Sequence, residues 1–138
     1  NMNGKLREII KSYKPSIVYT HSQKDIHHDH RKTFEATIIA TKPQNNFLIK
    51  KILTFEIPSS TDSNFYSETG NFCPNYFVDI ESQVNLKMKV LKKYQNEMKK
   101  YPHFRSLVGI KNLSMYRGNT VSLKFAEAFE LLRHIDYR

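Results

Sequence analysis

The chain has 138 residues, 39% of them hydrophobic, which suits one globular domain with a single core. Its 22 basic and 13 acidic side chains give a net charge of +9, and its one cysteine, Cys73, excludes an internal disulfide framework and a cysteine-based zinc site. We find no apolar run long enough to cross a membrane and no signal-peptide pattern, so we expect a reducing, cytoplasmic environment.

The first part of the chain predicts a helix, a strand, a polar loop and a second helix. Apolar residues recur at helical spacing over residues 4–14, and Pro15 ends that helix. The β-branched run SIVYTH (16–21) predicts a short buried strand. A helical pattern resumes over residues 30–41 and ends at Lys42-Pro43. This alternation of helix and strand is typical of a layered α/β fold.

The middle of the chain predicts two further apolar segments joined by a polar loop. Residues 48–58 indicate a second strand, and residues 76–80 form a third apolar run. Between them, residues 59–70 are polar and rich in turn formers, which favours a loop over a surface. Tyr66 in this loop could cover a substrate, although an exposed aromatic side chain in a loop usually has no such role.

The carboxyl-terminal part predicts mainly helix. Ser82 is placed to cap a helix over residues 83–101, which carries an apolar stripe. Residues 104–117 are weakly helical, and Gly118 suits the turn after them. Residues 123–133, LKFAEAFELLR, have helical propensity but form a short segment, so the residues alone leave its type open.

A dense histidine cluster marks the candidate site. Residues 21–31, HSQKDIHHDHR, hold four of the six histidines of the chain. His21 ends a predicted strand, and ligands of α/β proteins bind at the carboxyl ends of strands. His27 and His30 share a face if the loop turns helically, and either could bind a metal or transfer a proton. The alternative is a polar surface loop in which Asp29 caps a helix that begins at His30.

The net charge of +9 raises a second hypothesis, a non-catalytic module that binds an anionic glycan or nucleic acid. The lysines are scattered, however, and the densest group, between residues 87 and 100, fits the solvated face of one helix. No recognisable nucleic-acid-binding module is present. A metal-dependent nuclease that uses the His-Asp loop is a third and more remote hypothesis.

Five segments in order carry a family resemblance over nearly the whole chain. They are KPSIVYTHSQKDIHHDHRKTFEA (14–36), FEIPSSTD (55–62), FCPNYFVDI (72–80), LKMKVLKKYQNEM (86–98) and YRGNTVSLKFAEAFELLR (116–133). Together they resemble the LmbE/PIG-L family of metal-dependent N-deacetylases, which remove acetyl groups from amino sugars such as N-acetylglucosamine and from related glycoconjugates. The resemblance implies a Rossmann-like three-layer α/β sandwich, with the closing AEAF segment as a strand.

The resemblance also implies roles for individual residues. His30 corresponds to a zinc ligand, and His27 to the residue that assists the transition state as electrophile or proton donor. Asp29 corresponds to the carboxylate that orients a catalytic histidine. Arg117 and Glu127 match closing motifs of the family and could line the substrate pocket, although structural ion pairing is an equal alternative.

The chain departs from the family in one respect. The first family motif, His-Pro-Asp-Asp, supplies two further zinc ligands and the general base, and it is absent from these residues. We therefore interpret residues 1–138 as a single domain that is the carboxyl-terminal part of a longer α/β deacetylase, without its first strands and inactive alone. The remaining zinc ligands are expected in an amino-terminal segment or partner chain. The resemblance implies an acetylated amino-sugar substrate and is compatible with a homo-oligomer.

Overall fold

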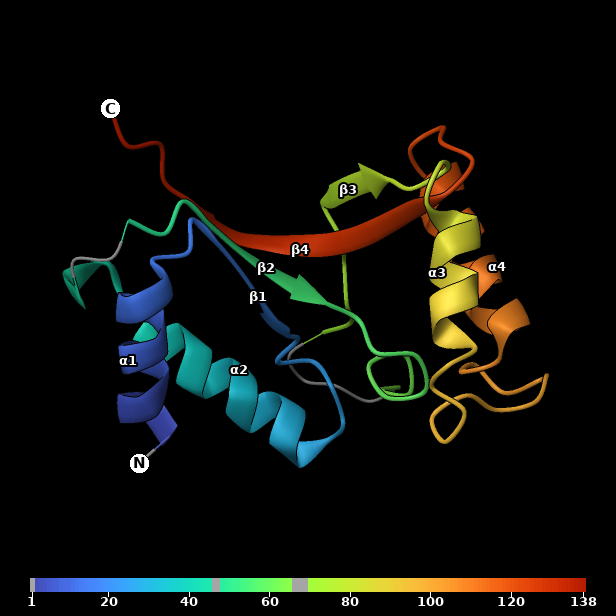
Figure 1. Ribbon diagram of the computed structural model, residues 1–138, viewed down its shortest axis with the longest axis horizontal. Coiled ribbons are helices and arrows are strands. Elements are labelled where there is room, and N and C mark those ends of the chain that lie inside the picture. The colour runs from blue at the N-terminus through green and yellow to red at the C-terminus, as the bar shows by residue number, and fades with distance from the viewer. Residues whose placement is uncertain (1, 46–47, 66–69) are drawn as a thin grey trace. The chain divides into compact units, whose positions relative to one another are not determined.

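The computed structural model describes residues 2–45, 48–65 and 70–138, which form two compact units (Figure 1). The first unit comprises residues 1–73 and 129–138, and the second comprises residues 74–128. Strand β4 begins in the second unit and ends in the first. Tyr66 lies outside the described residues. The expectation of a single domain over residues 1–138 stays a prediction.

The first unit is a layer of helices on a small sheet. Its strands are ordered β1, β2, β4, with β2 parallel to β1 and antiparallel to β4. Helices α1 and α2 lie on the same side of β1 and β2 (Figure 1). The elements are α1 (Met2–Tyr13), β1 (Ile17–His21), α2 (His28–Ala40), the 3-10 turn η1 (Pro43–Asn45), β2 (Lys51–Phe55) and β4 (Ala126–His134).

The core of the first unit lies between the helices and the sheet. Its buried residues are Ile10 of α1, Ala40 of α2, Ile49 and Ile52, and the partly buried Val18 of β1 packs against them. The three central residues of β2 are all buried, as expected for a strand covered on both faces. The helices and strands predicted in this half of the chain are therefore confirmed, with shorter bounds for β2. The prediction that the first strand is buried is wrong, because β1 is outermost in the strand order and Ile17 and Tyr19 on it are exposed.

The second unit contains β3 (Tyr76–Asp79), α3 (Val84–Leu91), α4 (Leu107–Asn119) and the first residues of β4. Helix α4 contacts both α3 and β3. Ser106 caps α4, because its hydroxyl oxygen accepts a hydrogen bond of 2.9 Å from the backbone N–H of Gly109. The weakly helical segment is therefore a helix, and the closing segment is a strand, as the family resemblance implies.

The prediction of one helix over residues 83–101 is wrong beyond Leu91. Helix α3 spans only Val84–Leu91, and its N-cap is Gln83 rather than Ser82. Residues 92–97 are all exposed and form turns. An amphipathic helix is stabilised mainly by packing of its apolar face. Since these residues bury no such face, their helical propensity does not extend α3.

Gly118 lies in the last turn of α4, not in the turn after it as predicted. A Cβ atom at this position would lie 2.7 Å from the carbonyl oxygen of Leu123 and 2.9 Å from the backbone nitrogen of Phe125. These distances are too short for real Cβ contacts, and both neighbours are backbone atoms. Glycine is therefore needed here because the following chain approaches the helix closely.

We predict that Gly118→Ala destabilises the protein by about 1–3 kcal/mol, the usual effect of overpacking. Gly4→Ala is the matched control, because a Cβ at exposed Gly4 in α1 would meet nothing within 4 Å. That substitution should stabilise the helix by about 0.5–1 kcal/mol. Thermal unfolding of both variants measures the difference, and a Gly118→Ala variant as stable as Gly4→Ala would contradict the close approach.

Candidate active site

The histidine cluster lies where the parallel strands end. Strand β1 ends at His21, and α2 begins at His28, so residues 22–27 form a loop at the carboxyl end of the parallel pair β1 and β2. Ligand sites of α/β folds occupy this position.

Within the described residues, no helix is both long and apolar enough to span a bilayer.

Three imidazole rings stack against one another in this region. The ring centroid of His30 lies 4.3 Å from that of His21 and 4.5 Å from that of His27. His27 is exposed, whereas His21 and His30 are partly buried. Burial, and next the neighbouring His30 ring, lower the pKa of His21. The predicted proximity of His27 and His30 is confirmed, and His21 is their neighbour.

Asp25 is a buried carboxylate beneath this stack that the sequence analysis missed. It is 1% exposed, and its Oδ1 accepts a 2.7 Å hydrogen bond from the backbone N–H of His27 and another from the Ser60 hydroxyl. Its Oδ2 accepts one of 2.9 Å from the Thr61 hydroxyl. Burial acts to raise the pKa of Asp25, but these hydrogen bonds outweigh burial and the pKa is lowered.

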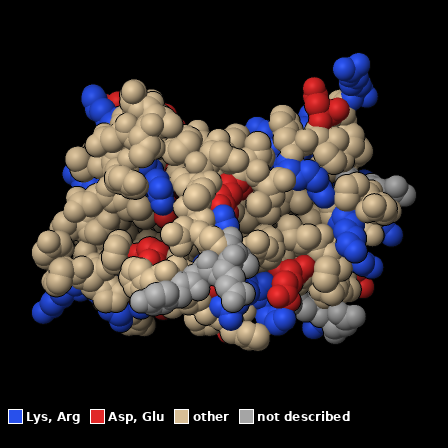
Figure 2. Space-filling view, turned by 180° about the vertical axis from the view of Figure 1, so that it is seen from behind, with Lys and Arg blue, Asp and Glu red and all other residues tan. Residues whose placement is uncertain are grey.

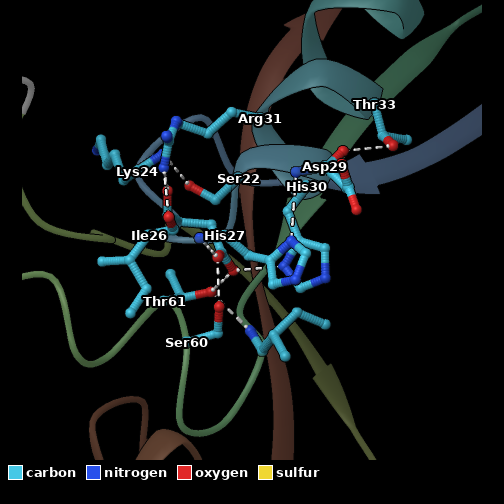
Figure 3. A network of polar contacts seen from close by, with 12 residues as sticks. Ser22, Lys24, Ile26, His27, Asp29, His30, Arg31, Thr33, Ser60 and Thr61 are labelled. Atoms are coloured by element: carbon cyan, nitrogen blue, oxygen red, sulfur yellow. Dashed lines mark hydrogen bonds and ion pairs between the residues drawn. The ribbon is translucent and has the colours of Figure 1, made fainter.

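Asp25 also faces His30. Its Oδ2 lies 3.0 Å from Nδ1 of His30, an ion-pair distance if the ring is protonated. Nδ1 is buried and makes no well-aligned hydrogen bond, so the contact is electrostatic rather than directional. Figure 3 shows Ser60 and Thr61, which follow β2, reaching towards the loop that carries His27 and His30. One carboxylate therefore joins the loops that follow two neighbouring strands.

His27 has a different environment. It is the N-cap of α2, and its Nδ1 accepts a 3.2 Å hydrogen bond from the backbone N–H of Asp29. The alternative in which Asp29 caps the helix is therefore wrong, because the extended backbone at His27 places the helix start two residues earlier. Asp29 contacts His27 through its amide, and its carboxylate lies in the first turn of α2, where the helix dipole favours it.

Further side chains fasten the loop. Arg31 donates hydrogen bonds of 2.7 and 2.6 Å to the carbonyl oxygens of Asp25 and Ile26. Lys24 forms a 2.7 Å ion pair with Glu130 of β4. Glu130 is 8% exposed and also accepts hydrogen bonds from the Thr54 hydroxyl and from a backbone amide. These contacts give the loop a defined conformation.

The two expected pocket residues lie in the second unit. Glu127 of β4 forms a 2.7 Å ion pair with Lys87. Arg117, in the last turn of α4, places its guanidinium 5.3 Å from the ring centre of Tyr116. Their roles in substrate binding stay predictions.

The donor set of the described residues does not form a complete metal site. Over residues 2–45, 48–65 and 70–138, no three His, Cys, Asp or Glu side chains are arranged to hold one ion. A catalytic zinc needs three protein ligands and an open position for water. The role of His30 as a zinc ligand stays a prediction.

Comparison with protein families finds a match for the first part of the chain. Residues 1–41 match the PIG-L family, described as GlcNAc-PI de-N-acetylase. This stretch contains α1, β1, the histidine loop and α2. The LmbE/PIG-L resemblance is confirmed. No curated protein matches the chain in sequence.

Solved structures share the fold over nearly the whole chain. The conserved protein TT1542 from Thermus thermophilus matches 99% of this chain with a TM-score of 0.70 and 17% identity. N,N'-diacetylchitobiose deacetylase from Pyrococcus horikoshii, solved with an inhibitor, matches 95% with a TM-score of 0.66 and 18% identity. GalB, the 4-carboxy-2-hydroxymuconate hydratase from Pseudomonas putida, matches 99% with a TM-score of 0.68 and 18% identity.

The chain spans only part of each of these structures. It covers 60% of the Thermus protein, 51% of the Pyrococcus deacetylase and 60% of the Pseudomonas hydratase. These similarities confirm the α/β fold of the LmbE/PIG-L type.

Proposed function

We propose that residues 1–138 form part of a zinc-dependent N-deacetylase that hydrolyses the N-acetyl group of an amino sugar or related glycoconjugate. In this proposal His30 is a zinc ligand and His27 is a proton donor. The observation that carries the proposal is the contrast between the two stacked rings. Nδ1 of His27 meets an amide donor, whereas Nδ1 of His30 meets a buried carboxylate.

This contrast suits the two roles. Because Nδ1 of His27 accepts a hydrogen bond, the neutral ring carries its proton on Nε2, and His27 is exposed. It could therefore donate to the oxyanion or to the leaving amine of an amide. The backbone amide of Asp29 would orient His27 for this step, and the orienting role expected of the Asp29 carboxylate stays a prediction. Zinc at such a site lowers the pKa of bound water to about 7 and polarises the carbonyl.

We further propose that a segment outside residues 1–138 completes the site along β1. This strand is outermost in the strand order, and its sequence IVYTH contains no Lys or Pro of the kind that protects an edge strand. Ile17 and Tyr19 on it are 40% and 50% exposed. A strand added parallel to β1 would end beside His21 and could bring the missing ligands and general base to His30.

The proposed substrate class rests on the match of residues 1–41, since the histidine loop itself belongs to the matched stretch. The fold alone does not decide the reaction, because it is shared with a deacetylase and with a hydratase. A stacked histidine pair suits amide hydrolysis, in which a proton must reach the departing amine.

The alternative of a polyanion-binding module has no specific support. Figure 2 shows Lys and Arg side chains scattered over one face and interspersed with Asp and Glu. Several basic residues are paired with acids, namely Lys24 with Glu130, Lys32 with Glu35, Lys87 with Glu127, Arg105 with Glu97 and Lys124 with Glu81. Such pairing offsets part of the positive charge.

We predict that the native gene product containing these residues releases acetate from a simple N-acetylglucosamine derivative. A chelator should abolish the release and added zinc should restore it. Acetate is measured by a coupled assay, with an unsaturated hydroxy acid as a parallel substrate for hydration. Zinc-loaded protein that hydrates the acid and leaves N-acetyl groups intact would overturn the proposal.

A further inference from the structure

The hydrogen bonds around the carboxylate of Asp25 favour its ionised form, which can only accept. Three donors point at its two oxygens, from the His27 backbone and from the Ser60 and Thr61 hydroxyls. A protonated carboxyl would turn one of these acceptor positions into a donor. A buried carboxylate is tolerated only when it is hydrogen-bonded or paired, and here the backbone N–H of His27 and the hydroxyls of Ser60 and Thr61 supply the hydrogen bonds.

The contact with His30 has a consequence for that ring. Nδ1 of His30 is buried and has no aligned hydrogen-bond partner among the described residues, and the carboxylate of Asp25 lies 3.0 Å from it. A carboxylate that only accepts favours a proton on the nitrogen that faces it. The neutral His30 ring would then carry its proton on Nδ1 and its lone pair on Nε2.

We propose that Asp25 is a positioning residue that favours the tautomer of His30 protonated on Nδ1, so that Nε2 carries the lone pair that would bind a metal. The metal part of this inference rests on the proposed function, whereas the tautomer part does not. Carboxylates commonly hold the far nitrogen of a metal-binding histidine in this way. The assignment differs from the sequence expectation, which gave the orienting carboxylate to Asp29.

The positions of Ser60 and Thr61 explain why the carboxylate of Asp25 would be held rigidly beside His30. Both residues follow β2, the strand next to β1. Ser59, which precedes them, has a left-handed backbone conformation with φ of 69°. Thr61 is 5% exposed and also accepts a 2.7 Å hydrogen bond from the backbone N–H of Ile57. The carboxylate of Asp25 is thereby held by two side chains of the loop that follows β2.

The tautomer can be observed without metal. Long-range ¹H–¹⁵N spectra of the labelled, metal-free protein at about pH 8, above the ordinary histidine pKa of about 6.5, distinguish protonated from bare ring nitrogens. The His30 signals are assigned by their loss in His30→Ala. We expect the proton on Nδ1 in the wild type and a shift towards Nε2 in Asp25→Asn, because an asparagine amide can donate to Nδ1.

Asp29→Asn is the matched control, since it removes the other carboxylate of the same loop and should leave the His30 tautomer unchanged. A wild-type ring with its proton on Nε2, or a tautomer that Asp25→Asn does not alter, would overturn the inference. If Asp25 had only a structural role, Asp25→Asn would lower stability and leave the His30 tautomer unchanged.

Zinc binding tests the second part in the native gene product. Asp25→Asn should weaken zinc about 10–100-fold, the usual effect of removing such a partner. Unchanged affinity in a variant whose tautomer has shifted would overturn the metal role of Asp25. If the wild-type product binds no zinc while the tautomer behaves as expected, the proposed function fails and the tautomer assignment stands.

Discussion

Alanine at His30 is expected to remove zinc from the native gene product and to abolish acetate release, whereas alanine at His27 should leave zinc in place. The reason is the different environment of the two stacked rings. The buried carboxylate of Asp25 faces His30, which would prepare His30 as a ligand in the proposed site, whereas His27 is exposed and would act there as the proton donor. His27→Ala should therefore lower kcat about 10²–10³-fold at nearly full zinc content.

His28→Ala is the control for this prediction, because His28, the first residue of α2, is an exposed histidine beside His27 to which we assign no role. It should change neither zinc content nor kcat. Zinc is measured by elemental analysis after dialysis, and kcat by acetate release. Equal loss of metal from His27→Ala and His30→Ala would refute the division of roles between the two rings.

Alanine at Asp25 is expected to destabilise the protein by about 3 kcal/mol. The substitution leaves the backbone N–H of His27 and the hydroxyls of Ser60 and Thr61 without their acceptor, and unsatisfied buried groups cost about 1–3 kcal/mol. It also separates the loops after β1 and β2, which this carboxylate joins. Since domains of this size are stable by only about 5–15 kcal/mol, the loss would be large.

Urea unfolding with linear extrapolation measures this loss. Ser60→Ala is the control, because it removes one donor and keeps the carboxylate, and it should cost only about 1 kcal/mol. An Asp25→Ala variant no less stable than Ser60→Ala would show that the network around Asp25 contributes little to the fold.

Local pattern was sufficient for much of the first unit. The strand 16–21 and the helices on either side of it were predicted because Pro15 separates two distinct periodicities and the strand is apolar and β-branched. The segment AEAFELLR shows where local pattern fails. Most of its residues are good helix formers, yet it forms β4, because residues from Phe129 onward pair with β2 and Phe129 is buried there.

The candidate site was predictable only in part. Four histidines within residues 21–30 gave a visible signal, and their proximity follows from their short spacing along the chain. Asp25 gave no such signal in the sequence. Its buried hydrogen-bond network depends on Ser60 and Thr61, which lie 35 and 36 positions further along the chain. The same holds for Glu130, which meets Lys24 only through the pairing of β4 with β2.

The zinc affinity of residues 1–138, compared with that of the native gene product by competition with a coloured chelator, decides whether this chain holds half of a metal site. We expect weak binding by residues 1–138 and affinity greater by orders of magnitude in the product, with His30→Ala lowering the latter, because a catalytic zinc needs three protein ligands. Tight binding by residues 1–138 alone, or zinc affinity in the product that survives His30→Ala, would contradict the proposed site.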